Sequence, residues 1–105
     1  MQKVSLILTT FNSKTNFIKT YASICRQTYP NIEIIIVDGN SNDGTQEEIK
    51  KYAALDERIH WISEKDSGIY NAMNKGLRMA SGDIIAFFND EFLDDRAVEK
   101  YVYTI

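Results

Sequence analysis

The stretch Ile32-Glu33-Ile34-Ile35-Ile36-Val37 decides the fold, because it is almost wholly apolar and the turn-rich stretch 38–44 follows it directly. A short apolar run of this kind is typical of a strand that is covered on both faces in a parallel sheet. Comparable runs occupy residues 4–9 and 84–88, and a more polar run occupies residues 59–62. The sequence therefore predicts four strands.

Helical stretches are predicted after each of these strands, at about residues 14–25, 45–54, 69–80 and 95–105. The predicted caps are, in chain order, Ser13, Thr45 paired with Glu48, Asp66 or Ser67, Gly82 at a helix end, and Asp94. Strands that alternate with helices in this way predict right-handed crossovers and a doubly wound, Rossmann-like α/β fold with helices on both faces of an open parallel sheet.

Length and composition limit the classes of protein that this chain can be. Its 105 residues fit one domain, and 44% hydrophobic with 26% charged residues is an ordinary globular mixture. The net charge is −3 and the lysines and arginines form no cluster, which argues against nucleic-acid binding. No apolar run reaches the roughly 18 residues of a membrane-spanning helix. With a single cysteine and no apolar leader, we expect a cytoplasmic protein, or a peripheral one at the inner face of the membrane.

The predicted topology also predicts where a ligand binds. In doubly wound sheets the ligand lies at the carboxyl ends of the strands, which here lead into residues 9–12, 38–44, 64–68 and 89–91. The first of these loops has no glycine, so a dinucleotide-binding G-x-G-x-x-G turn is excluded, and a P-loop motif is absent from the sequence. The second loop fails as an EF-hand because position 6 is Asp43 and position 12 is Ile49.

The same loops carry a family resemblance. The segments concerned are VSLILTTFN at 4–12, VDGNSNDGT at 37–45, EKDSGIYNAMNKG at 64–76 and SGDIIAFFN at 81–89. In this order they resemble the family 2 glycosyltransferases with the GT-A fold. The resemblance covers nearly the whole chain and implies a sheet with strand order 3-2-1-4. It identifies residues 1–105 as a single, truncated GT-A domain that binds a nucleotide sugar.

The resemblance also implies roles for individual residues. Thr10 and Asn12 match residues that line the base and ribose pocket, Asp38 matches the carboxylate that binds the base, and Asp66 matches a polar residue that faces the nucleotide. Each has a purely structural alternative. Thr10 and Asn12 stand where a strand runs into a helix, Asp38 could open an Asx-turn at Gly39, and Asp66 could be a helix cap.

A divalent metal, Mg²⁺ or Mn²⁺, is implied as the cofactor that bridges the diphosphate of the donor. In the family an Asp-x-Asp-like pair after the fourth strand binds it, because such cations prefer paired carboxylates. Here the text after Asn89 is Asp90-Glu91-Phe92. An alignment without gaps puts Phe92 at the last acidic position, whereas a shortened loop leaves Asp90 with Glu91 as the metal pair.

The implied function is transfer of a sugar from a UDP- or GDP-type donor to an acceptor, in the synthesis of a cell-surface polysaccharide. The general base is then expected in a C-terminal half beyond this chain, so the 105 residues alone are expected to be inactive. Two alternatives remain: an inactive remnant that at most binds nucleotide, and a receiver-like or flavodoxin-like signalling domain. The fourth strand would be an unprotected edge, which predicts a homo-oligomer through that edge.

Overall fold

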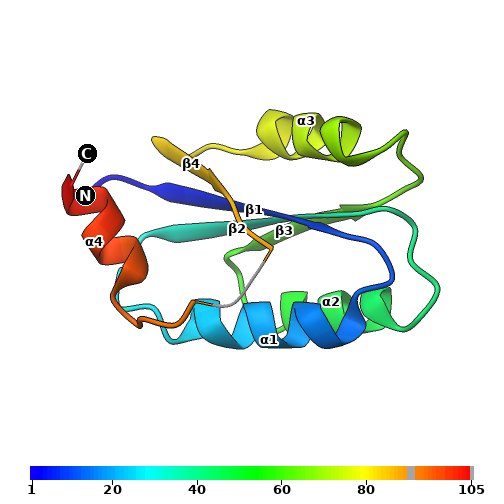
Figure 1. Cartoon of the computed structure of the whole chain (residues 1–105), viewed down its shortest axis with the longest axis horizontal. Coiled ribbons are helices and arrows are strands. Elements are labelled where there is room, and N and C mark those ends of the chain that lie inside the picture. Colours follow the sequence, from blue (N-terminus) through cyan, green and yellow to red (C-terminus); the bar gives the residue numbers. More distant parts are fainter. Residues whose placement is uncertain (90–91, 105) are drawn as a thin grey trace.

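The computed structural model describes residues 1–89 and 92–104 and shows an open sheet with helices on both sides (Figure 1). Within those residues the elements are, in chain order, β1 (Val4–Thr10), α1 (Lys14–Cys25), β2 (Ile32–Asp38), α2 (Thr45–Ala53), β3 (Ile59–Ser63), α3 (Ile69–Met79), β4 (Ile84–Phe87) and α4 (Ala97–Thr104). The predicted alternation of strands and helices is confirmed. The boundaries differ from the prediction by one or two residues, and β2 ends on Asp38 itself.

The strand order β3-β2-β1-β4, with every pair parallel, is the one expected. The register sets Thr10 opposite Asp38, and Asp38 opposite Ser63. Three strands therefore bring polar residues side by side at the carboxyl edge of the sheet.

The two faces of the sheet are covered unequally. The larger core lies on the side of α1 and α2, and α4 adds Val98 and Val102 to it. On the opposite face α3 packs on β1 and β2, where a smaller core forms from Ile7, Ile35, Val37 and Ala72. Residues 32–38 of β2 are buried on both faces, which explains the unbroken apolar run in the sequence.

The close approach of α3 to the sheet depends on Gly76. A Cβ atom at this position would overlap the Cγ2 atom of Ile7 in the central strand. Gly82 meets a similar limit, because its Cβ would lie 2.8 Å from the carbonyl oxygen of Lys3. The helix-end cap predicted at Gly82, which requires a left-handed backbone, is wrong: α3 ends at Met79, its C-cap Ala80 is extended, and Gly82 has no positive φ. Glycine is required at position 82 by contact with β1.

The helix caps also differ from the prediction. Ser13 and Gly44 occupy the N-cap positions of α1 and α2, and neither makes a side-chain cap hydrogen bond. The Asp43 side chain instead accepts a hydrogen bond from the first residue of each helix. Its Oδ2 accepts from Lys14 N–H at 3.3 Å and its Oδ1 accepts from Thr45 N–H at 3.0 Å. The predicted Thr45–Glu48 capping box is therefore absent. One carboxylate ties the starts of two helices together, and local sequence spacing cannot reveal a cap shared across about 30 residues.

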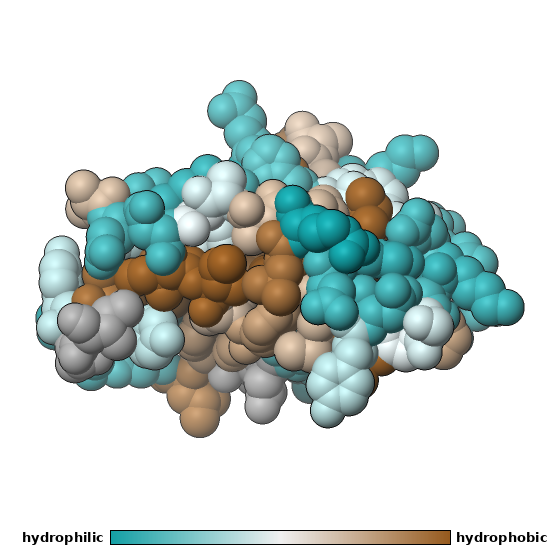
Figure 2. All heavy atoms as spheres, turned by 90° about the horizontal axis from the view of Figure 1, so that it is seen from above, coloured by the Kyte–Doolittle hydropathy of each residue, from teal (hydrophilic) through white to brown (hydrophobic). Residues whose placement is uncertain are grey.

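The edge strand β4 is left partly uncovered. Its Ile84 side chain is buried on the side of α1, whereas Ile85 and Phe87, in register with Ser5 and Ile7 on the α3 face, are 39% and 44% exposed. Seen from the α3 side, apolar side chains form a brown band over the left half of the view, and most of the right half is hydrophilic (Figure 2). No helix in the described part of the chain is long and apolar enough to cross a membrane.

Candidate nucleotide-binding site

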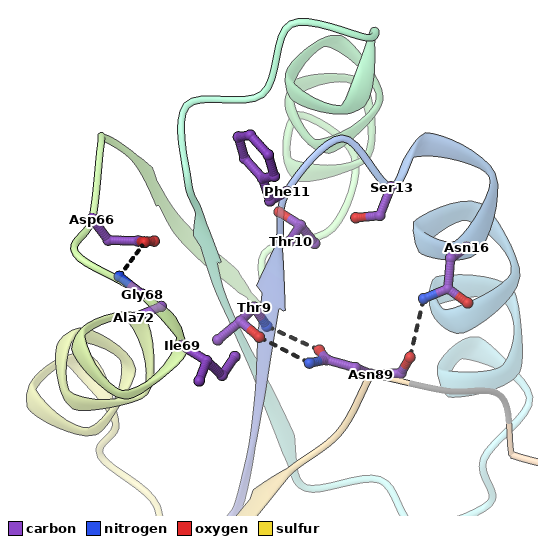
Figure 3. A pocket seen from close by; sticks show the side chains of 10 residues that line it. All are labelled: Thr9, Thr10, Phe11, Ser13, Asn16, Asp66, Gly68, Ile69, Ala72 and Asn89. Carbon is purple, nitrogen blue, oxygen red and sulfur yellow. Dashed lines mark hydrogen bonds between the residues drawn. The ribbon is translucent and has the colours of Figure 1, made fainter.

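A pocket of about 440 Å³ opens at the carboxyl edge of the sheet, between the starts of α1 and α3 (Figure 3). The lining residues come from three segments that are distant in sequence: Thr9, Thr10, Phe11, Ser13, Asn16, Asp66, Gly68, Ile69, Ala72 and Asn89. The pocket lies where the topology predicts a ligand.

Asp38 is fully buried and does not line this pocket, but it binds Thr10, which does. Its Oδ1 accepts hydrogen bonds from the hydroxyls of Thr10 and Ser41, each at 2.6 Å. Its Oδ2 accepts from Ser41 N–H and from the Ser63 hydroxyl, each at 2.8 Å. A buried carboxylate is stable only when it is hydrogen bonded in this way. Asp38 therefore ties the ends of β1, β2 and β3 together, and direct contact with a base would require it to give up one of these four bonds.

Asn12 joins the two loops at the mouth of the pocket. Its backbone has a positive φ of 46°, which turns its amide group toward the loop after β2. Asn12 N–H donates to Ser41 Oγ at 2.8 Å, and Asn12 Oδ1 accepts from Asn42 N–H at 2.9 Å. Asn12 is not among the lining residues. Of the four residues predicted to bind nucleotide, Thr10 and Asp66 line the pocket, while Asn12 and Asp38 support the loops around it.

Phe11 and Asp66 both line the pocket and lie on either side of Gly39, and the part of the pocket that these two residues line is called the slot. A Cβ atom on Gly39 would lie 3.1 Å from Asp66 Oδ2 and 3.4 Å from Phe11 Cδ1. Phe11 is 65% exposed and lines the pocket, so its ring is accessible to a ligand. Phe11 is not among the residues predicted from the sequence to bind a ligand. The sequence feature that could have identified Phe11 is its position directly after the first strand, where the topology predicts a ligand.

Asp66 is held by its own loop. Its Oδ1 accepts from Gly68 N–H at 3.1 Å, and Gly68, with a positive φ of 129°, occupies the N-cap position of α3. The predicted cap at Asp66 or Ser67 is thus one or two residues early, although the Asp66 side chain does close the turn ahead of the helix. Oδ2 of Asp66 remains directed to the slot beside Gly39.

The opposite wall of the pocket is neutral. Asn89 Oδ1 accepts from Thr9 N–H at 2.9 Å, and Asn89 Nδ2 donates to Thr9 Oγ1 at 2.8 Å. Asn16 Nδ2 donates to the carbonyl of Asn89 at 3.0 Å (Figure 3). Because the Thr9 hydroxyl already accepts one bond, its own proton is available to a ligand, as is the second amide hydrogen of Asn89. This wall therefore offers hydrogen-bond donors to the oxygen atoms of a ligand.

The metal ligands expected from the resemblance, Asp90 and Glu91, lie outside the described residues. Within residues 1–89 and 92–104 no group of three histidine, cysteine or acidic side chains is close enough to hold a metal ion. Among the described lining residues Asp66 is the sole carboxylate. One carboxylate does not make the oxygen ligand set that Mg²⁺ or Mn²⁺ requires, so the described residues alone provide no metal site.

The fold and pocket define a doubly wound protein that binds its ligand at the carboxyl edge of a parallel sheet. The profile of the family "Glycosyl transferase family 2" matches residues 5–105, and the chain belongs to that family. One relative is TuaG from Bacillus subtilis, a glycosyltransferase assigned by its name to teichuronic acid biosynthesis. It is 38% identical over 84% of this chain and 35% of its own length.

Two solved structures share the fold over 96% of this chain. Mannosyltransferase PcManGT from Pyrobaculum calidifontis, in complex with GDP-Man and Mn²⁺, superposes with a TM-score of 0.87 at 24% identity. S. aureus TarS 1-349, in complex with UDP-GlcNAc, superposes with a TM-score of 0.86 at 23% identity. The chain spans 31% and 30% of these two chains, so it corresponds to about a third of each relative.

Proposed function

We propose that this chain is the donor-binding unit of a glycosyltransferase that moves a sugar from a UDP- or GDP-linked donor to an acceptor. The observation that carries the proposal is the pocket at the carboxyl edge of the sheet, which the exposed Phe11 ring and the Asp66 carboxylate both line. Family membership and the nucleotide sugars bound to PcManGT and TarS support it.

The slot has the chemistry that a nucleobase requires. An exposed aromatic ring stacks on a base, which contributes about 1–3 kcal/mol per base in single-stranded nucleic-acid complexes. The Asp66 carboxylate accepts a charge-assisted hydrogen bond from a ring N–H, which both uracil and guanine offer. The remainder of the donor then lies along the neutral wall, where Thr9, Asn16 and Asn89 donate to phosphate or sugar oxygens. Asp38 acts through Thr10 and Ser41 by holding the floor of the slot.

The metal and the acceptor belong to the same proposal. Asp90 and Glu91 would hold Mg²⁺ or Mn²⁺, which neutralises the charge of the departing diphosphate when bound. We treat residues 1–105 as one domain. The general base and the acceptor site are expected from chain beyond these residues. The TuaG relationship favours a cell-surface polysaccharide as the acceptor. Cys25 has no second cysteine to pair with, which favours a cytoplasmic location.

Self-association through β4 is part of the proposal as well. The strand Ile84–Phe87 is an edge with no charged residue or proline, and its α3 face is partly exposed. Such an edge favours pairing with another strand. Light scattering at increasing concentration tests this: growth of a dimer supports pairing, and a monomer throughout contradicts it.

Titration calorimetry with UDP and GDP, with and without Mn²⁺, tests the donor site. Binding that requires Mn²⁺ supports both the slot and the pair Asp90–Glu91. Binding that ignores Mn²⁺ supports the slot and removes the metal assignment. If neither nucleotide binds, the proposal is wrong, and the chain is better described as an inactive remnant of a transferase.

Variants at the slot make the test specific. Gly39→Ala places a methyl group between Phe11 and Asp66, and its backbone conformation suits alanine, so we expect at least tenfold weaker binding with an unchanged melting temperature. Asp66→Asn removes the charge and keeps an oxygen for Gly68 N–H. Asp95→Asn is the matched control, because Asp95 pairs at the surface with Arg26, at the other end of α1. Equal affinities in Asp66→Asn and Asp95→Asn would refute the role of Asp66.

A further inference from the structure

The loop between β3 and α3, residues 64–68, is held in place by side chains of α3. Ser67 N–H donates to Asn71 Oδ1 at 3.1 Å. One helical turn later, Lys75 Nζ lies 2.9 Å from Glu64 Oε1 and donates to the carbonyl oxygen of Lys65 at 3.3 Å. Asn71 and Lys75 are four residues apart and therefore share one face of the helix. This face contacts the loop directly before and directly after Asp66.

Of the two α3 side chains that contact the loop, Lys75 makes the stronger contact. Its side chain is only 12% exposed, whereas that of Glu64 is 55% exposed. A lysine stem that is packed in this way limits where its ammonium group can reach. Both acceptors of Lys75 belong to the loop, so a movement of the loop would break both of its contacts. The cost of that state favours a single loop conformation.

The contact is transmitted to the slot through one peptide unit. Lys65, whose carbonyl oxygen Lys75 binds, immediately precedes Asp66 in the chain. Asp66 is fixed from its other side by Gly68 N–H, and Glu64 N–H donates to the carbonyl of Asp38 at 3.0 Å. The Asp66 carboxylate consequently keeps its place beside Gly39.

We infer that Lys75 is a positioning residue of the donor site: it holds the 64–68 loop so that Asp66 faces the nucleobase. The inference rests on the proposed function for its ligand. The Lys75 ammonium contacts the loop and does not line the pocket, so its effect on the nucleotide passes through Asp66.

A double-mutant cycle measures that dependence. Lys75→Met keeps the length and helix propensity of the side chain and removes its charge. We expect it to weaken UDP or GDP binding about tenfold, which corresponds to about 1.4 kcal/mol. In an Asp66→Asn background the same change is expected to have little further effect, because coupled residues are not additive. Lys100→Met is the matched control: Lys100 lies in α4, its Nζ pairs with Oδ2 of Asp94 ahead of that helix at 2.6 Å, and neither residue lines the pocket.

A second measurement is independent of nucleotide binding. Amide hydrogen exchange of Ser67 and Gly68 reports the loop directly, and Lys75→Met is expected to speed both at least tenfold, while the core amides of β2 exchange as before. Lys75→Arg is expected to preserve protection, because a cation remains. If Lys75→Met fails to fold, Glu64→Gln removes the charged acceptor from the other side and is expected to speed the same two amides.

The possible outcomes distinguish a failure of the inference about Lys75 from a failure of the proposed function. Tenfold weaker binding that vanishes in the Asp66→Asn background, with faster exchange in the loop, supports Lys75 as a positioning residue. Additive effects of Lys75→Met and Asp66→Asn, or unchanged exchange of Ser67 and Gly68, overturn it. If the unmodified chain binds neither UDP nor GDP, the proposed function fails, and the exchange of Ser67 and Gly68 alone decides whether Lys75 holds the loop.

Discussion

Glu33 provides a quantitative test of how this small domain is stabilised. It lies near the amino end of β2, at the opposite end of the sheet from the pocket, and is 5% exposed. Its Oε2 accepts from the Ser5 hydroxyl at 2.6 Å and from Ser81 N–H at 3.0 Å, and its Oε1 accepts from the Ser81 hydroxyl at 2.9 Å. Lys3 Nζ is 3.5 Å from Oε1. These contacts join β1, β2 and the segment that leads into β4.

The charge state of Glu33 should therefore govern stability in acid. Burial by itself raises the pKa of this carboxyl, but the hydrogen bonds from Ser5 and Ser81 and the charge of Lys3 outweigh it and lower the pKa from 4.5 to about 2. A group whose pKa is lower in the folded state stabilises the fold above its unfolded pKa and loses that contribution as pH falls. The shift corresponds to about 3 kcal/mol at pH 7, of which about 2 kcal/mol is lost between pH 6 and pH 3.

Urea unfolding of the unmodified chain and of Glu33→Gln, at pH 7 and at pH 3, measures this contribution. We expect Glu33→Gln to be less stable by about 3 kcal/mol at pH 7 and by only about 1 kcal/mol at pH 3. Glu57→Gln, which changes an exposed glutamate, is the control for net charge and should stay within about 0.5 kcal/mol of the unmodified chain at both values. A deficit in Glu33→Gln that is equally large at pH 3 and pH 7 would refute the assignment of this stability to the carboxylate charge.

Three further outcomes are expected. Gly76→Ala should destabilise the fold by about 1–2 kcal/mol in urea unfolding, because overlap with Ile7 outweighs the gain in helix propensity, and the loss should shrink when Ile7→Ala is added. Asp38→Ala should cost about 3 kcal/mol or more, since it leaves buried hydroxyls without an acceptor; a loss below 1 kcal/mol would contradict the network. Tyr21→Phe should raise the pKa of Asp56 above its present value of about 2, because the Tyr21 hydroxyl donates to that carboxylate at 2.7 Å. NMR titration of Asp56 measures this change.

The predicted nucleotide site shows where residue patterns stop being informative. Thr10 and Asp66 line the pocket because topology alone puts their loops at the carboxyl edge of the sheet. Phe11 was missed, although it follows Thr10 directly, because an exposed aromatic residue in a loop has no distinctive spacing. The roles assigned to Thr10, Asn12, Asp38, Asp66 and the metal pair all remain predictions.

The sequence by itself determined the elements and their order. Apolar runs such as 32–37 have the length of a strand and almost no polar side chain, so they require cover on both sides. Alternation with helices then predicts right-handed crossovers and a doubly wound sheet, whereas the strand order came from the family resemblance. The apolar runs and the helical patterns are local features, and each can be recognised within about ten residues.

Only the tertiary structure decided which polar side chains meet. Asp43 caps two helices whose starts are about 30 residues apart, Asp38 binds hydroxyls from two neighbouring strands, and Lys75 reaches back to a loop ten residues earlier. A hydrogen bond depends on distances of about 3 Å, and such distances are fixed by the register of strands and the packing of helices on the sheet. Sequence spacing carries no record of them, so these partners became visible only in the folded chain.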